Sequence, residues 1–323
     1  MLGAIIGDIV GSRWEFNPTN DYDIEWLSKE NGFTDDTICT VAVADALLHE
    51  RDFGESIHDW CNRYPHPMGG YGGRFAQWVR SENPKPYNSF GNGAAMRVSP
   101  VAYWYEYIDE VLDAAAATAL PTHNHDEGIK GAQTVALAIF RALQFNKKCY
   151  QDASRHIDEI LKECVEFSGY DINMPKSAVL NKFDETCQGT VPVALKIISM
   201  ATDYVDAVRL AVSLGADADT LGAIVGSIAE AIWGIPSSKD DIREYLSGDI
   251  YEVLFLFCHE MPFPRKELID DTFYKKEFTD VSWDVLHDFD GPEECERMKR
   301  IVNDEKDELR ELMKKRGKAR ELW

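Results

Sequence analysis

Two short segments far apart in the chain, Gly3-Ala4-Ile5-Ile6-Gly7-Asp8-Ile9 and Gly222-Ala223-Ile224-Val225-Gly226-Ser227-Ile228, repeat one pattern of glycine and apolar residues. If both are helical, glycines at a spacing of four form a stripe without side chains on one face. Such a stripe lets helix backbones approach closely, which offsets the roughly 1 kcal/mol that each interior glycine costs. A strand leading into a phosphate-binding turn is the alternative for 3–9, but neither G-x-G-x-x-G nor a βαβ pattern is present. The pattern therefore favours buried helices in close backbone contact.

Most of the remaining chain has the periodicity of amphipathic helices, and convincing alternating strand patterns are missing. Residues 34–49 begin with Thr and Asp and continue with apolar residues at helical spacing, which is typical of a helix N-terminus. The segment 62–99 is rich in Gly, Pro and aromatic residues and is predicted to be a long irregular piece, usually a functional one. We therefore predict an all-α protein, with further helices at 108–119, 127–145, 151–166, 190–202, 204–214, 219–233, 240–260 and 293–316.

The composition limits the classes of partner. The chain has 323 residues and a formal net charge of −22, from 34 basic and 56 acidic side chains. Nucleic acid and anionic membranes are disfavoured as non-specific partners, because both would be repelled. A compact anionic ligand held by metal ions and backbone donors remains compatible with this charge, since local fields decide its binding.

The character of the chain changes near position 260. Residues 262–292 are loop-like, and 293–316 predict a charge-dense helix whose charges are most simply a solvated face. We expect a helical domain over 1–260 and a charged extension over 261–323, with a helix packed on or beside the main domain.

The seven cysteines are scattered, odd in number and never spaced as C-x-x-C. Neither a disulfide framework nor a structural zinc site fits this usage, and reduced thiols in a cytosol fit better. No stretch approaches the ~18 apolar residues of a membrane span, and Asp8 interrupts the apolar N-terminal run. A cytoplasmic location is therefore expected.

Two acidic clusters carry the strongest chemical signal: Thr34-Asp35-Asp36-Thr37 and Asp217-Ala218-Asp219-Thr220. Each opens a predicted helix, where the helix dipole favours ionised carboxylates. A single such cluster is most simply an N-cap. Two of them beside glycine-striped apolar helices suggest convergence, and converging carboxylates repel each other unless cations neutralise them. Oxygen ligands from Asp and Thr suit hard cations, so we predict two Mg²⁺ or Mn²⁺ ions.

Further residues are candidates for roles beside such a site. Glu15 follows the first helix and is either an exposed partner of Arg13 or a general acid/base near the metals. The segments Ser89–Arg97 and Gly69–Gly73 are rich in small residues, which leave backbone N–H groups free for phosphate oxygens. Tight turns are the commoner explanation of either segment alone.

His123-Asn124-His125-Asp126-Glu127 precedes the predicted helix 127–145 and permits a different reading. His125-Asp126 matches the metal-binding dipeptide of an HD-type phosphohydrolase. That site also needs an upstream histidine on a helix, and none of His49, His58 and His66 has an evident helical counterpart. His123 alone is most simply a cap or a satisfied loop residue.

Taken in order, five motifs resemble those of the ADP-ribosylglycohydrolase family, which includes the enzyme that reactivates dinitrogenase reductase. They cover roughly residues 1–250: Gly7-Asp8-(x)-Val10-Gly11 with Glu15-Phe16, Thr34-Asp35-Asp36-Thr37, Gly91-Asn92-Gly93-Ala94-Ala95-Met96-Arg97, Thr122-His123, and Asp217-Ala218-Asp219-Thr220.

The resemblance implies an orthogonal multi-helix bundle with a dinuclear Mg²⁺ or Mn²⁺ site. It implies that the metal ligands are Thr34, Asp35, Asp36, Asp217, Asp219 and Thr220. Glu15 corresponds to the family's mobile glutamate, and Asp36 and Asp219 are further catalytic candidates. The ADP-ribose cleft should be lined by Ser89, Phe90, Gly91, Asn92 and His123, with Phe90 stacking on adenine and with Gly70, Gly72 and Gly73 around the diphosphate.

The function that the resemblance implies is metal-dependent hydrolysis of the glycosidic bond between ADP-ribose and an acceptor on a protein or small conjugate. A non-catalytic ADP-ribose or nucleotide binder and the HD-type phosphohydrolase are the alternatives. The chain departs from the family pattern at three places. Ser12-Arg13-Trp14-Glu15 stands where many members have a small or Pro-containing stretch, and Ala94 stands where some members have glycine. The segment after about residue 260 has no counterpart in the family. Arg13 and Trp14 beside Glu15 leave the acceptor open.

Overall fold

The computed structural model describes residues 1–147, 153–236 and 241–261, and also 311, 314–316, 318, 320 and 323. Among these residues there are helices and loops but no β-strand, apart from one isolated antiparallel bridge between Gly91 and Thr186. The predicted all-α fold is confirmed. The helices are α1 (Leu2–Gly11), α2 (Asp35–Leu48), α3 (Phe53–Arg63), α4 (Gly73–Val79), α5 (Gly93–Met96), α6 (Ser99–Trp104), α7 (Ile108–Ala119), α8 (Asp126–Lys147), α9 (Ile157–Ser168), α10 (Cys187–Met200), α11 (Tyr204–Val212), α12 (Ala218–Trp233) and α13 (Gly248–Glu260).

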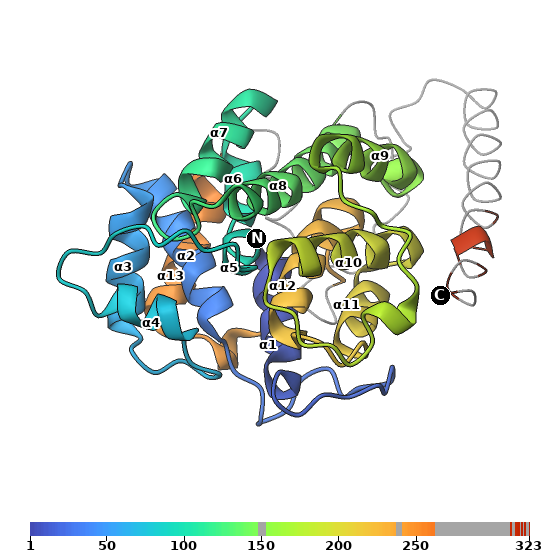
Figure 1. The fold of residues 1–323 in the computed structure, drawn as a ribbon, viewed down its shortest axis with the longest axis horizontal. Coiled ribbons are helices and arrows are strands. Elements are labelled where there is room, and N and C mark those ends of the chain that lie inside the picture. The colour runs from blue at the N-terminus through green and yellow to red at the C-terminus, as the bar shows by residue number, and fades with distance from the viewer. Residues whose placement is uncertain are drawn as a thin grey trace, which may run out of the picture.

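The two glycine-striped segments form α1 and α12, and they pack on each other in opposite directions (Figure 1). A Cβ built at Gly7 would lie 2.0 Å from the carbonyl oxygen of Gly222, and one built at Gly226 would lie 2.2 Å from that of Gly3. Backbone therefore touches backbone along this seam, which only glycine permits. Both helices are buried throughout, so the seam fixes how their ends are placed in the molecule.

Hydrogen bonds also hold α1 in place beside the glycine contacts. The Gly3 N–H donates to Glu230 of α12 at 2.9 Å, and the Tyr204 hydroxyl donates to the Gly3 carbonyl at 2.9 Å. Glu230 and Tyr204 are both buried, and the bond from Gly3 to Glu230 satisfies one of the N–H groups at the start of α1 that have no partner within the helix. Around this pair, buried side chains from all the other helices complete the apolar core.

The segment 62–99 is more ordered than the sequence predicted, because it contains the short helices α4 and α5. Phe75, Trp78 and Val79 bury one face of α4. A helix of seven residues is too short to show a period against a glycine-rich background, which explains the difference. The helix predicted over 240–260 also begins later, at Gly248.

The end of the chain touches the main domain at four described residues, of which Lys315 pairs with Asp158 at 3.5 Å. Arg316 donates to the Ser154 carbonyl at 2.6 Å, and Arg320 forms an ion pair of 2.9 Å with Asp206. The Trp323 indole donates to the Met174 carbonyl at 3.1 Å. Most of the helix predicted over 293–316 lies outside the described residues. The five described cysteines are buried and form no disulfide (Cys39, Cys61, Cys164, Cys187 and Cys258). No described helix combines the length and apolarity that a membrane span needs.

Candidate active site

A cleft of about 460 Å³ opens where the loop after α1, the segment 69–97 and the start of α12 meet. Most of the predicted site residues line it, although they come from five separate parts of the sequence. The lining includes Glu15, Asp35, Gly70, Gly72, Gly73, Ser89, Phe90, Gly91, Asn92, His123, Asp217, Asp219 and Thr220. Thr34 and Asp36 are buried and do not line it, but Asp36 accepts a hydrogen bond from the lining residue Thr220.

The first acidic cluster begins α2, and its threonine rather than its aspartates makes the cap. Thr34 has extended backbone, and its hydroxyl accepts a hydrogen bond from the Asp36 N–H at 3.2 Å. The Asp35 and Asp36 side chains are thereby left for other roles. Asp36 is 2% exposed, whereas Asp35 is partly buried and reaches the cleft.

Asp8 fixes the start of α2 to α1. This buried carboxylate accepts hydrogen bonds from the backbone N–H and the hydroxyl of both Thr34 and Thr37, at 2.5–3.1 Å. Four donors satisfy it, so Asp8 is an anchor for the acidic cluster. Sequence reasoning gave Asp8 no role, although a lone carboxylate inside a glycine-striped apolar helix was a signal.

The second acidic cluster begins α12. Asp217 occupies the N-cap position, but its side chain does not cap the helix; it accepts a hydrogen bond of 2.7 Å from the Asn92 amide. Thr220 donates to Asp36 at 3.2 Å and so joins the two helix starts. The two clusters converge, because the glycine seam holds α12 against α1 while Asp8 holds α2 on the same helix.

The convergence makes the carboxyl groups hard to ionise. Burial, followed by the charge of Asp219, raises the pKa of Asp36 well above its usual value, and burial with the charge of Asp217 does the same for Asp219. Burial also raises the pKa of Asp217 to about 7 and that of Glu15 to about 8, with Asp219 adding to the latter. No described basic side chain forms an ion pair with any of them within 4 Å.

The donor set fits divalent cations. Asp36 Oδ1, Asp219 Oδ1 and Glu15 Oε2 are buried oxygen atoms without a hydrogen-bond partner. Carboxylate oxygens lie within 4.8 Å of one another in two groups that share Asp219: one adds Asp8 and Asp36, the other Glu15 and Asp217. Buried oxygens without partners are costly. Hard cations prefer such oxygen ligands, and a shared carboxylate is suited to two adjacent ions.

The two glycine-rich segments differ in what their backbones offer. The Ser89 N–H already donates to the Thr122 carbonyl, and the Gly91 N–H donates to the Ser89 hydroxyl. The Asn92 N–H donates to the Glu185 carbonyl. These three N–H groups are thus not free for phosphate oxygens, contrary to what the small residues suggested. At Gly70, Gly72 and Gly73, by contrast, a Cβ would meet nothing within 4 Å. The loop before α4 is therefore the open wall of the cleft.

The opposite end of the cleft is basic, and the sequence did not single it out. Arg97 is fully buried, Arg74 lies over the Tyr87 ring at 4.8 Å, and neither forms an ion pair among the described residues. His123 lies beside them at 5% exposure. Glu185 and Thr186 also line the cleft without having been predicted. Only their folding against Gly91 and Asn92 brings them there, which no local pattern reveals.

His125 does not belong to a metal site. Its Nδ1 accepts a hydrogen bond of 3.0 Å from the Glu127 N–H, and its ring contacts Phe90 edge-on at 5.3 Å. His49 and His58 bond backbone carbonyls elsewhere. Among the described residues, the groups able to hold a metal contain no histidine. The HD-type arrangement is thus unsupported.

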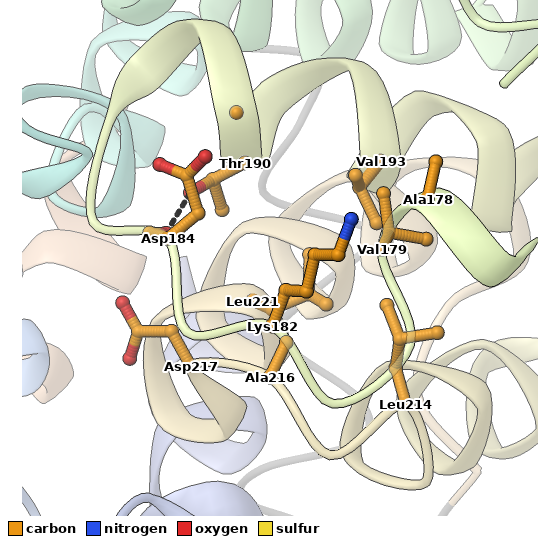
Figure 2. Close-up of a pocket in the computed structure, with 11 residues that line it drawn as sticks. Ala178, Val179, Lys182, Asp184, Thr190, Val193, Leu214, Ala216, Asp217 and Leu221 are labelled. Carbon is orange, nitrogen blue, oxygen red and sulfur yellow. Dashed lines mark hydrogen bonds between the residues drawn. The ribbon is translucent and has the colours of Figure 1, made fainter.

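A second, smaller cavity of about 60 Å³ lies behind Asp217, between α10 and α12 (Figure 2). Lys182 lies across it among apolar side chains, and Asp184 and Asp217 mark one edge. Such a volume holds one or two water molecules, since a water occupies about 30 Å³ of liquid. The larger cleft is therefore the candidate ligand site.

Comparison with known proteins agrees with this geometry. Residues 1–263 match the ADP-ribosylglycohydrolase family. The protein YegU of Escherichia coli (strain K12) is 27% identical, with 77% of this chain and 90% of that protein covered. Human ADP-ribosylhydrolase ARH3 is 25% identical, with 77% and 88% covered, and ADP-ribosylarginine hydrolase Tri1 of Pseudomonas putida (strain GB-1) is 23% identical, with 73% and 70% covered.

A solved structure titled ADP-ribosylglycohydrolase-related protein complex superimposes with a TM-score of 0.56 at 24% identity, covering 79% of this chain and 94% of the other. This likeness shows the fold. The family match spans well over half of the sequence, and the chain therefore belongs to the ADP-ribosylglycohydrolase family.

Proposed function

We propose that this protein hydrolyses the glycosidic bond between ADP-ribose and an acceptor, in a metal-dependent reaction. Family membership and relatives named ADP-ribosylhydrolases support the reaction class. The observation that carries the metal dependence is the buried acidic cluster, in which Asp36 Oδ1, Asp219 Oδ1 and Glu15 Oε2 have no hydrogen-bond partner.

The cations, Mg²⁺ or Mn²⁺, would be held by the side chains that begin α2 and α12: Thr34, Asp35, Asp36, Asp217, Asp219 and Thr220. Bound cations would supply Lewis-acid polarisation of substrate oxygens and would neutralise the carboxylates. Thr220 supports this role, since its hydroxyl donates to Asp36 at 3.2 Å, and the Thr34 oxygen lies 3.4 Å from the same carboxylate while its hydrogen goes to Asp8. The proposal places two ions here, and the two oxygen groups that share Asp219 support that number.

Glu15 is the residue best placed to move a proton. It lies on the loop after α1, lines the cleft, and has its carboxylate directly over Gly69, where a Cβ would lie 2.3 Å from Oε2. A pKa raised to about 8 lets its carboxyl group hold a proton near neutral pH. We assign Glu15 the protonation of the leaving group, and the surrounding carboxylates the stabilisation of positive charge at the anomeric carbon.

A non-catalytic binder of ADP-ribose is the competing function. The glycine loop, Phe90 and the basic end of the cleft would serve a binder equally well. The acidic end would not, because a binder of a dianionic ligand gains nothing from uncompensated carboxylates beside it. The retention of this end supports an enzyme.

The test is the release of ADP-ribose from a panel of ADP-ribosylated acceptors, with Mn²⁺ or Mg²⁺, by the wild-type protein and by Asp36→Asn and Asp219→Asn. Both variants keep the size of the side chain but remove a charge, and each should lower the rate by about 10³-fold. Near-normal rates in both would contradict the assignment.

Asp45→Asn is the matched control, since Asp45 is another buried carboxylate of α2. It accepts hydrogen bonds from Arg51 and Trp60 outside the cleft. This variant should lose stability but retain release. Tight ADP-ribose binding by the wild-type protein without release from any acceptor would instead favour the non-catalytic binder.

A further inference from the structure

The basic end of the cleft contains a buried cation without a counter-charge. Arg97 is 0% exposed, and no carboxylate among the described residues pairs with it. Its Nη2 donates to the Thr118 carbonyl at 2.9 Å and to the Thr122 hydroxyl at 2.8 Å, whereas its Nε has no partner. A buried charge is costly without compensation, so the position of Arg97 calls for an explanation.

Thr122 connects Arg97 to His123. Its Oγ1 lies 2.8 Å from the Arg97 Nη2 and 2.7 Å from the His123 Nδ1, and all three side chains are buried. A guanidinium group only donates, so the threonine oxygen accepts from Arg97. The single hydroxyl hydrogen of Thr122 is then left for His123, and Nδ1 accepts it.

A hydrogen bond in the opposite direction, from His123 to Thr122, is unfavourable. If the His123 Nδ1 carried a proton and donated it, Thr122 would accept two hydrogen bonds, and its own hydrogen would have no acceptor in a fully buried position. A doubly protonated ring is also disfavoured. Burial, with the nearby charges of Arg97 and Arg74, lowers the pKa of His123 well below its usual value.

The other nitrogen of the ring faces open space over two glycines. A Cβ at Gly91 or at Gly93 would lie 3.2 Å from the His123 Nε2, so side chains there would crowd it. We propose that Arg97 and Thr122 are positioning residues that hold His123 as the neutral tautomer with its proton on Nε2, so that it donates a hydrogen bond to an oxygen of the ligand.

The identity of that ligand as an ADP-ribosyl group rests on the proposed function, whereas the tautomer is a property of the free protein. Arg97 thus acts through two hydrogen bonds rather than by touching the ligand. A histidine fixed in this way accepts nothing through Nε2, and it selects oxygen acceptors at this end of the cleft.

The direct test is long-range ¹H–¹⁵N NMR of the full chain labelled at histidine, without ligand. The signal of His123 is assigned by its loss in His123→Gln. Nδ1 is expected to have a pyridine-like ¹⁵N shift and Nε2 a pyrrole-like one, unchanged between pH 6 and pH 8. The reverse pattern in the wild-type protein would overturn the proposal.

Variants of Thr122 test the relay itself. Thr122→Val keeps the shape and removes the hydroxyl, so a mixture of tautomers should appear, while Thr122→Ser should keep the wild-type pattern. Thr134→Val is the matched control, because Thr134 is also fully buried but bonds its own helix at the Lys130 carbonyl. An unchanged pattern in Thr122→Val contradicts the relay.

Calorimetry with ADP-ribose tests the consequence for binding. The affinity should fall about five- to tenfold in Thr122→Val, recover in Thr122→Ser and stay unchanged in Thr134→Val. A changed tautomer with unchanged affinity would show that His123 does not donate to this ligand. If the wild-type protein binds no ADP-ribose, the proposed function fails, and the NMR result still decides the relay.

Discussion

The two ends of the cleft have opposite charge and are built in opposite ways. At the acidic end, Asp36, Asp217 and Asp219 converge from two helix N-termini, and no described basic side chain pairs with them. At the basic end, Arg97 and His123 are buried with no carboxylate between them. Each end thus leaves charges uncompensated in the same cleft.

This difference indicates that the cleft is completed by what it binds. Cations would neutralise the acidic end, and the anionic part of a ligand would compensate Arg97. A protein pays for such an arrangement in stability, because charges without partners are poorly solvated in its interior. The rest of the fold must therefore hold the two ends in place.

The largest effect is expected at the glycine seam, which holds α12 and its acidic cluster against α1. In Gly222→Ala, the new Cβ would lie 2.5 Å from the Gly7 carbonyl oxygen, so α1 and α12 must separate and the two acidic clusters must move apart. We expect a loss of about 3 kcal/mol of unfolding free energy by urea denaturation, together with loss of metal binding.

Gly248→Ala is the control for this variant. Gly248 begins α13, and a Cβ there would meet nothing within 4 Å. Its stability should be unchanged or slightly higher, since alanine restricts the unfolded chain more than glycine does. Equal stability of the two variants would show that the seam does not hold the acidic end.

The next largest effect concerns the acidic end alone: the stabilisation of the protein by metal binding should depend on pH. In the metal-free protein, folding raises the pKa of Asp217 to about 7 and that of Glu15 to about 8, from unfolded values near 4. Each carboxyl group therefore contributes stability below its unfolded pKa, and this stability is lost as the pH rises through the folded pKa. Metal binding should therefore raise the melting temperature more at pH 8 than at pH 5.

We expect a rise of about 5 °C at pH 8 in saturating Mn²⁺ and a rise near zero at pH 5, measured by calorimetry. Protonation competes with the cations at the lower pH, which is the physical reason. A rise of equal size at both pH values would mean that the ions bind elsewhere.

The smallest effect is expected on the wall between the two ends. Phe90 is 42% exposed and lines the cleft, so Phe90→Ala should weaken ADP-ribose binding about fivefold through lost stacking. Phe167→Ala is the matched control, because Phe167 is 41% exposed on α9 and does not line the cleft. Equal affinities of the two variants for ADP-ribose would show that Phe90 does not contribute to binding.

The sequence predicted the acidic end better than the basic end, and the reason is physical. Carboxylates at helix starts form a local pattern, and the glycine stripes at 3–11 and 222–226 predict close contact between helix backbones. Neither pattern says that α1 and α12 are each other's partners, which the structure shows. Arg97, Thr122 and His123 interact only after α5 and the turn before α8 have packed, so no spacing in the sequence identifies the relay.

The short helices were missed for a related reason. α4 and α5 have too few residues for a period, and their positions depend on tertiary contacts such as the Asn92 N–H bond to the Glu185 carbonyl at 2.6 Å. The same contacts use up the N–H groups that the small residues at 89–92 were expected to offer.

Metal dependence is measured by the rate at which the metal-free wild-type protein releases ADP-ribose from an ADP-ribosylated substrate, before and after Mn²⁺ is added. We expect no release above background in the presence of a chelator and full recovery with the ion. Release at the same rate with and without the chelator would contradict this dependence.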